Sequence, residues 1–260
     1  MREPIVAGQF YDDDPDLLRQ QLDKAFSGIR ADLKNVRAMI VPHAGYMFSG
    51  RCAAQGYKAI EKDTPKRIFI LGPSHGGFPT SFSKEDWKTP LGVVETDKQA
   101  IERLSEKLDI PVEDSYHRGE HSIEVQLPFL QYIYKEAPMI VPLMVSGDLD
   151  MEKIGKALSQ EEGLIIVSSD FTHYGDNFRY VPFRENVKEN MYKLDRSAID
   201  LILDKDTKGF KGFVLEKEAT ICGAYPILLL LHTLKDEKGE LMQYYTSGDV
   251  TRDYTNAVGY

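Results

Sequence analysis

The stretch Arg67 to Gly77, RIFILGPSHGG, combines the two features that decide the fold. It begins with four consecutive apolar residues, Ile68 to Leu71, and ends in a turn rich in glycine and proline. A short apolar run bounded by turn residues is typical of a strand that is buried on both faces of a parallel sheet. Ser74 and His75 lie within the turn, so polar side chains directly follow a buried strand.

The same plan occurs at two other places in the chain. The apolar run 38–41 leads into His43, and the apolar run 164–167 leads into a polar turn that contains His173. Ligands in an open α/β sheet bind beyond the carboxyl ends of the strands, so three such turns can converge on one crevice. We therefore expect His43, His75 and His173 to lie at one end of one sheet.

The rest of the chain alternates between helical periodicity and apolar runs. The pattern predicts a strand at 139–145, a long helix at 185–203 and closing strands at 240–250 and 255–260. Strands that alternate with helices predict an α/β layered sandwich with a largely parallel central sheet flanked by helices. Because no repeat, low-complexity tract or linker interrupts this alternation, residues 1–260 are predicted to form one domain.

Two local patterns bear on the helices. The aspartates at 12–14 resemble a metal site, but negative charge favours a helix start, so an N-cap and first turn is the stronger interpretation. A helix is also expected from 122 to 134. Pro128 falls in the first turns of this helix, and proline removes a backbone donor there, so a kink is predicted.

Composition limits the class of protein. The chain has 260 residues, of which 42% are hydrophobic, so it can bury a sizeable core. Its formal net charge is −9, and the acidic residues are spread along the chain. An acidic chain without a basic patch gains nothing from counterion release on DNA or RNA, so no nucleic-acid partner is expected.

The number of cysteines and the hydropathy of the chain indicate a cellular compartment. Only Cys52 and Cys222 are present, which offers no disulfide framework and suits a reducing environment. The segment 1–14 lacks the apolar core of a signal peptide, and the apolar run 226–231 is too short to cross a bilayer. We expect a cytoplasmic protein without a membrane partner, and the sequence leaves its oligomeric state open.

Histidines supply most of the candidate chemistry. They are His43, His75, His117, His121, His173 and His232. His232 lies within an apolar helical stretch, where a structural role is the better interpretation. The other five lie in polar turns, and three of these turns share the plan described above. Since neutral imidazole is the commonest metal ligand in proteins, the shared plan favours a metal site.

Cys222 is a fourth candidate, because it precedes the apolar helix predicted at 223–234. The exposed N–H groups at a helix start favour a thiolate, which suits a metal ligand or a nucleophile. The alternative is a small buried apolar residue, and this interpretation fits Cys52 well.

Two acid–imidazole pairs complete the candidate residues. Asp170 precedes His173 by three residues, and a carboxylate can orient an imidazole for proton transfer, so we expect Asp170 to hold the His173 ring. Glu120 and His121 form the second pair, for which capping of the following helix is an equal alternative. The sequence leaves the roles of Glu120, His121 and Asp249 open.

Six motifs resemble those of a known family. They are V-P-H-A-G-Y at 41–46, G-P-S-H at 72–75, E-H-S-I-E-V-Q-L-P-F-L at 120–130, S-S-D-F-T-H-Y-G at 168–175, T-I-C-G at 220–223 and S-G-D-V at 247–250. In this order they resemble the Memo family, also called AmmeMemoRadiSam system protein B in bacteria and archaea. The resemblance implies a LigB-like fold, similar to that of the class III extradiol dioxygenases. Those enzymes cleave catechol rings with Fe(II) bound by two histidines and a glutamate, and another histidine acts as acid/base.

The resemblance also implies roles for individual residues. On the dioxygenase pattern His43 and His75 match the two histidine ligands, and His173 matches the acid/base histidine. Cys222 stands where the carboxylate ligand would be, and a thiolate favours softer ions than a carboxylate does. Two imidazoles and one thiolate would hold iron, copper or zinc and leave a position open for water or substrate.

Three functions remain open on this evidence. The first is a metal-dependent enzyme of redox or dioxygenase-like type, with the ion on His43, His75 and Cys222 and with Asp170 and His173 as catalytic residues. The second is a binding module that uses the same crevice for a peptide or small molecule, as the resemblance also implies. The third is a hydrolase in which Cys222 is the nucleophile and His173 its base.

Overall fold

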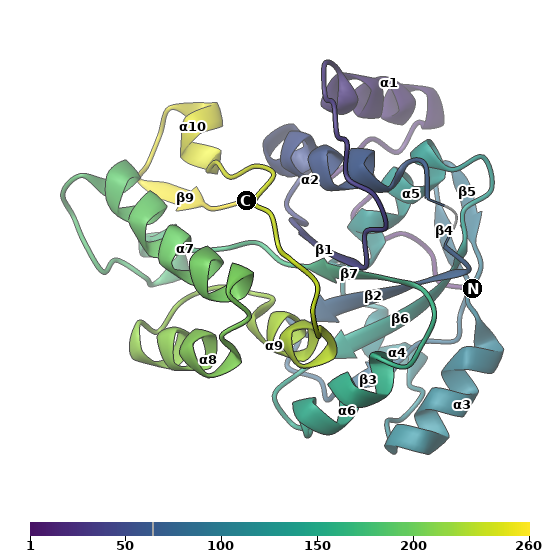
Figure 1. The fold of residues 1–260 in the computed structure, drawn as a ribbon. Helices are drawn as coiled ribbons and strands as arrows, with labels where there is room; N and C mark the ends of the chain where they lie inside the picture. The colour runs from purple at the N-terminus through teal and green to yellow at the C-terminus, as the bar shows by residue number, and fades with distance from the viewer. Residues whose placement is uncertain (64) are drawn as a thin grey trace.

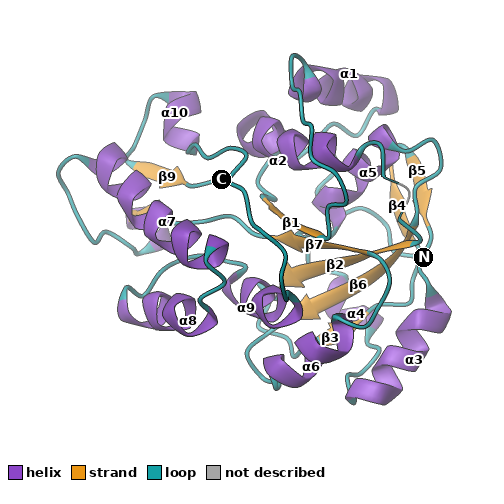
Figure 2. Cartoon of the chain, in the orientation of Figure 1, coloured by secondary structure: helices purple, strands orange, loops and turns teal. Residues whose placement is uncertain are grey.

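The computed structural model describes residues 1–63 and 65–260. Its centre is a five-stranded sheet with helices on both faces (Figures 1 and 2). In spatial order the strands are β1 (Ala38–Val41), β7 (Leu164–Ser168), β2 (Arg67–Pro73), β6 (Met139–Val145) and β3 (Ser81–Phe82). The first four pair in parallel and β3 pairs antiparallel with β6. The predicted α/β sandwich with a largely parallel central sheet is confirmed.

The apolar run in β2 explains why this strand lies at the centre. Ile68 to Leu71 are at most 1% exposed, because both faces of the strand are covered. Successive side chains point to opposite faces, so Phe69 and Leu71 join one hydrophobic cluster while Ile68 and Ile70 join the other. The core therefore consists of two apolar layers, one between each sheet face and its helices.

The helices are short to medium in length. They are α1 (Pro15–Phe26), α2 (Tyr46–Ile60), α3 (Lys98–Leu108), α4 (Asp114–His117), α5 (Leu127–Ile133), α6 (Met151–Leu158), α7 (Val187–Leu203), α8 (Thr207–Glu216), α9 (Ala224–Thr233) and α10 (Ser247–Thr251). Two antiparallel pairs complete the strands, β4 (Trp87–Thr89) with β5 (Gly92–Val94) and β8 (His173–Gly175) with β9 (Asn256–Val258). Across the described residues, no helix has both the length and the hydropathy needed to span a bilayer.

The prediction of a closing strand at 240–250 is wrong. Residues 240–246 have no regular structure apart from a single bridge at Thr246, and α10 follows. The Thr246 side chain accepts the N–H of Asp249, and the Asp249 carboxylate accepts the N–H of Thr246, which forms a capping box. The second closing strand exists but is confined to β9, which pairs with β8.

The kink predicted at Pro128 is also wrong. Residues Glu124–Gln126 form a 3-10 turn, and Pro128 occupies one of the first two positions of α5. A proline at a helix start loses no hydrogen bond, because the first N–H groups have no partner within the helix. At α1 the cap interpretation is confirmed, since the Asp14 carboxylate accepts the N–H groups of Asp16 and Leu17.

Candidate metal centre

Sheet topology brings the predicted histidines together. His43 lies two residues beyond β1, His75 two residues beyond β2, and His173 opens β8 shortly after β7. Because β1, β7 and β2 are neighbours and parallel, their carboxyl ends meet at one edge. The ring centroids of His43 and His75 are 5.3 Å apart. The expectation of one shared edge is confirmed.

Cys222 reaches the same place from a distant part of the chain. Its Sγ lies 3.3 Å from Nε2 of His43 and 3.2 Å from the backbone nitrogen of Asp170, which donates to it. The segment before Cys222 is fixed to β8, since the N–H of His173 donates to Oγ1 of Thr220 at 2.9 Å. Cys222 and the histidines therefore form one site.

The hydrogen bonds around His43 determine its tautomer. Oγ of Ser168 donates its only proton to the carbonyl of Ser122 at 2.7 Å and accepts from Nε2 of Gln126. Nδ1 of His43 lies 3.0 Å from the same oxygen and must therefore be the donor. Nε2 of His43 is consequently unprotonated. Burial lowers the pKa of His43 well below its ordinary value, which keeps the ring neutral.

His75 is held in the same way by a carboxylate. Its Nδ1 lies 2.9 Å from Oε1 of Glu120, and its backbone N–H donates to Oε2 at 2.8 Å. Burial opposes ionisation of Glu120, but the hydrogen bonds and charge of His75 outweigh it and hold the pKa of that carboxyl well below its usual range. The ionised carboxylate can only accept, so Nδ1 of His75 bears a proton and Nε2 is the ring nitrogen left for another partner.

His173 is oriented by backbone carbonyls. Its Nδ1 lies 2.9 Å from the oxygens of both Phe171 and Thr220, which can only accept, so Nε2 is again the free nitrogen. The prediction that Asp170 holds this ring is wrong. The Asp170 carboxylate instead accepts the backbone N–H of His43 at 2.8 Å.

Burial disfavours the negatively charged forms of the groups around Cys222. It raises the pKa of the Cys222 thiol well above its ordinary value and also raises the pKa of Asp170. A thiol whose pKa is raised in this way has no advantage as a free nucleophile at neutral pH. A metal ion would favour the thiolate directly, and its binding would release the proton.

His121 is the site residue that sequence reasoning did not assign. The described residues include two groups of three potential ligands whose donor atoms lie within 4.8 Å of one another. One group is His43, His75 and His121, and the other is His43, Asp170 and Cys222. The ring of His121 stacks on His75 with centroids 4.8 Å apart and planes at 15°. The pair E-H at 120–121 was the available signal. The predicted set of His43, His75 and Cys222 combines members of both groups.

Exposed aromatic side chains lie close to these residues along the chain. Phe178 is 38% exposed and meets the His173 ring edge-on at 5.1 Å. Phe78 is 41% exposed in the loop that carries His75, and Tyr225 is 49% exposed three residues after Cys222. Aromatic side chains left in water beside a polar site provide flat apolar contact surface for an organic ligand.

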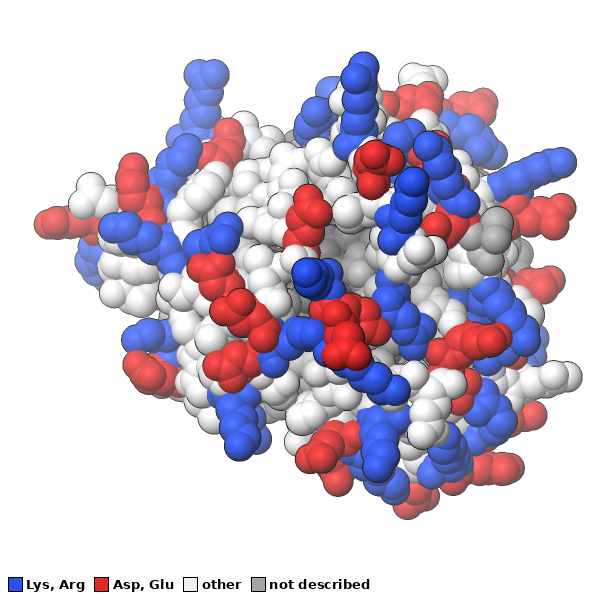
Figure 3. All heavy atoms as spheres, viewed as in Figure 1, with Lys and Arg blue, Asp and Glu red and all other residues white. Residues whose placement is uncertain are grey.

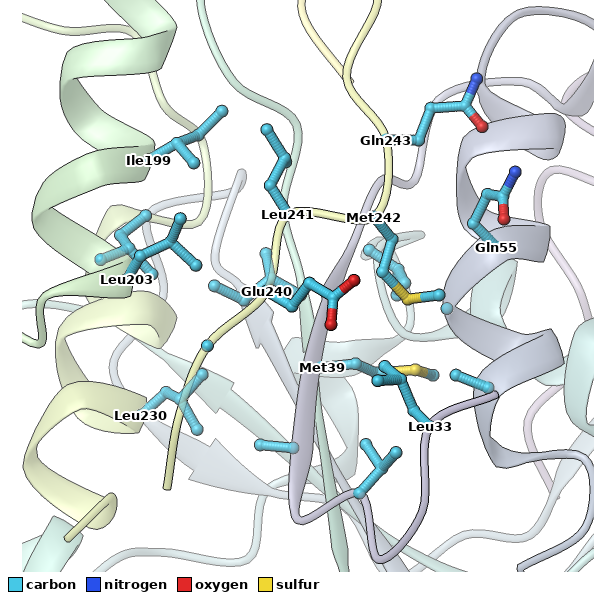
Figure 4. A pocket seen from close by; sticks show the side chains of 18 of the residues that line it. Leu33, Met39, Gln55, Ile199, Leu203, Leu230, Glu240, Leu241, Met242 and Gln243 are labelled. Atoms are coloured by element: carbon cyan, nitrogen blue, oxygen red, sulfur yellow. The ribbon is translucent and has the colours of Figure 1, made fainter. Parts of the chain in front are cut away.

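A cavity of about 440 Å³ lies elsewhere, along the outer edge of β1. Figure 4 shows its lining, which includes Met39 from β1, Gln55 from α2, Leu203 from α7 and Leu241 from the segment after α9. Charged side chains of both signs are interspersed on the face seen in Figure 3. Because neither group of potential ligands lines this cavity as a set, donor chemistry rather than volume identifies the candidate site.

Similarity to known proteins extends along the whole chain. A family model described as "Memo-like protein" matches residues 2–260. A MEMO1 family protein of Methanosarcina barkeri is 37% identical over 276 residues, covering 100% of this chain and 98% of that protein. One of Pyrococcus furiosus is 38% identical over 285 residues, covering 100% and 97%. A crystal structure of an uncharacterized protein of Escherichia coli K12 has a TM-score of 0.45 to this chain. The two share 12% sequence identity, over 75% of this chain and 85% of that chain.

Proposed function

Because the chain belongs to the Memo family, we propose that its histidine-lined crevice is the metal-dependent site of a redox or dioxygenase-like enzyme. The observation that carries this proposal is the common presentation of His43, His75 and His173. Each ring has its Nδ1 fixed against an acceptor and leaves Nε2 free. Imidazoles are presented to metal ions in this way, with the second nitrogen hydrogen-bonded to a carboxylate, carbonyl or hydroxyl.

The donor set fits an ion. We assign His43, His75 and Cys222 as ligands, which leaves a position open for water or substrate. Bonds of roughly 2.0–2.3 Å place two ligands of one tetrahedral ion about 3.3–3.8 Å apart. Nε2 of His43 and Sγ of Cys222, at 3.3 Å, already have this spacing. A bound iron, copper or zinc ion would supply a Lewis acid, and iron or copper also a redox couple.

His173 is assigned as the acid/base residue. Its backbone N–H and carbonyl both bond Oγ1 of Thr220, and Nδ1 is held by two carbonyls, so the ring is fixed while Nε2 stays free to exchange a proton. Asp170 contributes through charge rather than through contact. Burial raises its pKa, and the positive charge that His173 acquires on protonation acts in the opposite direction.

A second candidate function is supported by the exposed aromatic side chains. Phe78, Phe178 and Tyr225 would give a peptide or small molecule an apolar contact surface whether or not chemistry follows. This candidate is a binding module that keeps the crevice without a reaction.

Metal analysis of protein purified without chelators tests the proposal. We expect about one ion per chain in the wild type and in His173→Ala, and a sharp loss in His43→Ala and Cys222→Ser. His232→Ala is the matched control, because His232 lies on α9 outside both ligand groups. Wild-type protein without stoichiometric iron, copper or zinc would favour the binding module, as would ligand affinity that survives chelation.

A further inference from the structure

We propose that the cavity along the outer edge of β1 is a second ligand site, separate from the histidine-lined crevice, and that its ligand is a short apolar peptide with a free C-terminal carboxylate. The cavity holds about 440 Å³, and sites for small ligands typically hold roughly 300–1,000 Å³. It lies between β1, α2, α7, the end of α9 and the segment 237–244 (Figure 4). No member of either group of potential metal ligands lines it, so this site goes beyond the proposed function.

The edge of β1 that borders the cavity has free backbone groups. Among the described residues, β1 pairs only with β7. The carbonyls of Arg37 and Val41 accept N–H groups from the β7 segment. Because the bonding direction alternates along a strand, Ala38 and Ile40 point their N–H and carbonyl groups away from β7, toward the cavity that both residues line. Within the described part of the chain, these four groups have no backbone partner.

A peptide strand supplies the hydrogen-bonding groups that this edge lacks. An extended chain presents an N–H and a carbonyl on one side at every second residue, which is the repeat of Ala38 and Ile40 along β1. Peptides add to free sheet edges through such main-chain bonds. Since β1 spans four residues, the matching ligand has about four residues. A hydrocarbon chain of the same shape would leave the four groups of β1 unpaired and cut off from water, which is unfavourable.

Apolar walls on both faces of β1 select the side chains of the ligand. Alternate side chains of an added strand point to opposite faces of the sheet. One face of the cavity is bounded by α2, and Leu203 of α7 and Leu230 of α9 bound the other (Figure 4). Met39 and Met242 also line the cavity, and flexible thioether side chains adapt to ligands of different shape. The walls therefore favour a peptide whose consecutive residues are all apolar.

The charge of the lining favours an anionic ligand. Four basic and two acidic side chains line the cavity: Lys34, Arg37, Lys205, Lys238, Glu237 and Glu240. The lining therefore has an excess of positive charge, although the net charge of the chain is −9. Arg37 and Lys205 donate to backbone carbonyls, which are neutral and leave the charge of both side chains uncompensated. The carboxylate at the C-terminus of a peptide supplies the complementary charge.

Titration of the purified wild-type chain with the tetrapeptide acetyl-Leu-Val-Leu-Val tests the proposal. Calorimetry should show about one peptide per chain, and the C-terminal amide of this peptide should bind at least about fivefold more weakly. Hydrogen exchange followed by NMR should show that the peptide slows the amides of Ala38 and Ile40 at least about tenfold. The amides of Met39 and Val41, which already bond β7, should change little. Of two peptides N-methylated at alternate residues, the one with its methyl groups against β1 should bind at least about tenfold more weakly.

A variant that fills the cavity locates the peptide. Leu203→Trp should weaken binding at least about tenfold, because the larger side chain occupies the space of the ligand. Leu215→Trp is the matched control, since Leu215 is 69% exposed on α8 and does not line the cavity. Leu241→Trp replaces Leu203→Trp if circular dichroism shows that variant to be unfolded. Unchanged affinity in the cavity-filling variant would overturn the site.

Three other results would also overturn the proposal. The first is the absence of saturable peptide binding to the wild type. The second is protection of the Ala38 and Ile40 amides without peptide, which would mean that the segment 240–244 closes on β1 itself. The third is decanoate that binds once per chain and more tightly than the peptide, which would make the cavity a site for acyl chains. Each of these results leaves the proposed function intact, because the crevice takes no part in them.

Discussion

The buried ion pair between Arg2 and Glu124 should dominate the stability of the N-terminal segment. Nη1 of Arg2 lies 2.7 Å from Oε2 of Glu124, and the two side chains are 2% and 0% exposed. The Glu124 carboxylate also accepts the N–H groups of Ile5 and Val6 and the hydroxyl of Tyr11. Removing one partner of such a pair leaves the other charge buried without compensation.

We expect Glu124→Gln to lower the free energy of unfolding by about 3–5 kcal/mol, the range typical of broken buried pairs. For a chain of this size that corresponds to a fall in Tm of roughly 6–20 °C. The double variant Arg2→Met/Glu124→Gln should recover part of the loss, because neither buried charge then lacks a partner. Urea unfolding of the wild type, both single variants and the double variant measures the coupling.

Asp200→Asn provides the matched control, since Asp200 pairs with Arg196 on the surface of α7 with side chains 52% and 56% exposed. Its cost should stay below about 1 kcal/mol. If Glu124→Gln lowers the free energy of unfolding no more than this control does, the buried pair does not hold the N-terminal segment and the reasoning is refuted.

Three further predictions concern separate parts of the fold. Burial raises the pKa of Asp195 from 3.8 to about 6, so the folded state binds the proton more tightly than the unfolded state. The free energy of unfolding should therefore fall by roughly 2 kcal/mol on this account as pH rises from 4 to 7, and Asp195→Asn should lose this component. Parallel pH profiles of the two proteins would contradict this prediction. Gly175→Ala should lower the free energy of unfolding in urea by at least about 2 kcal/mol. The reason is that φ of Gly175 is 121° and an added Cβ would lie 2.5 Å from the backbone oxygen of Thr255. An unchanged free energy of unfolding would contradict this geometry. A thiol reagent should label Cys222 faster than the more deeply buried Cys52, and added Zn²⁺ should protect Cys222 alone; labelling that ignores zinc would argue against ligation.

The sheet and the convergence of the histidines could be predicted from sequence because both follow from local patterns. The apolar run Ile68 to Leu71 is typical of a doubly buried strand, and the carboxyl ends of neighbouring parallel strands lie at the same edge of a sheet. The partner of each side chain could not be predicted in the same way. Asp170 binds the N–H of His43 across 127 residues rather than its neighbour His173, and spacing along the chain carries no information about such contacts.

The role of His121 and the structure of segment 240–250 were not predicted correctly, for related reasons. The role of His121 depends on the ring stacking against His75, which the tertiary fold alone sets. In 240–250 the apolar and aromatic residues favoured a strand, but the capping box at Thr246 and Asp249 starts a helix instead. A strand also requires a neighbour with free backbone groups, and tertiary structure decides where one exists.

The anchoring of the N-terminal arm couples two events that are far apart along the chain. Arg2 donates to the carbonyl of Glu120 at 2.6 Å, and Glu120 in turn holds His75. Undocking of residues 1–11 would loosen the loop that positions His75, a candidate metal ligand. By reciprocity, anything that binds His75 in its present orientation stabilises the docked arm by the same free energy. The amide hydrogens of Ile5 and Val6, which Glu124 shields, would then exchange more slowly in protein with a ligand on His75. The first residues of the chain would thereby report binding at the candidate metal site.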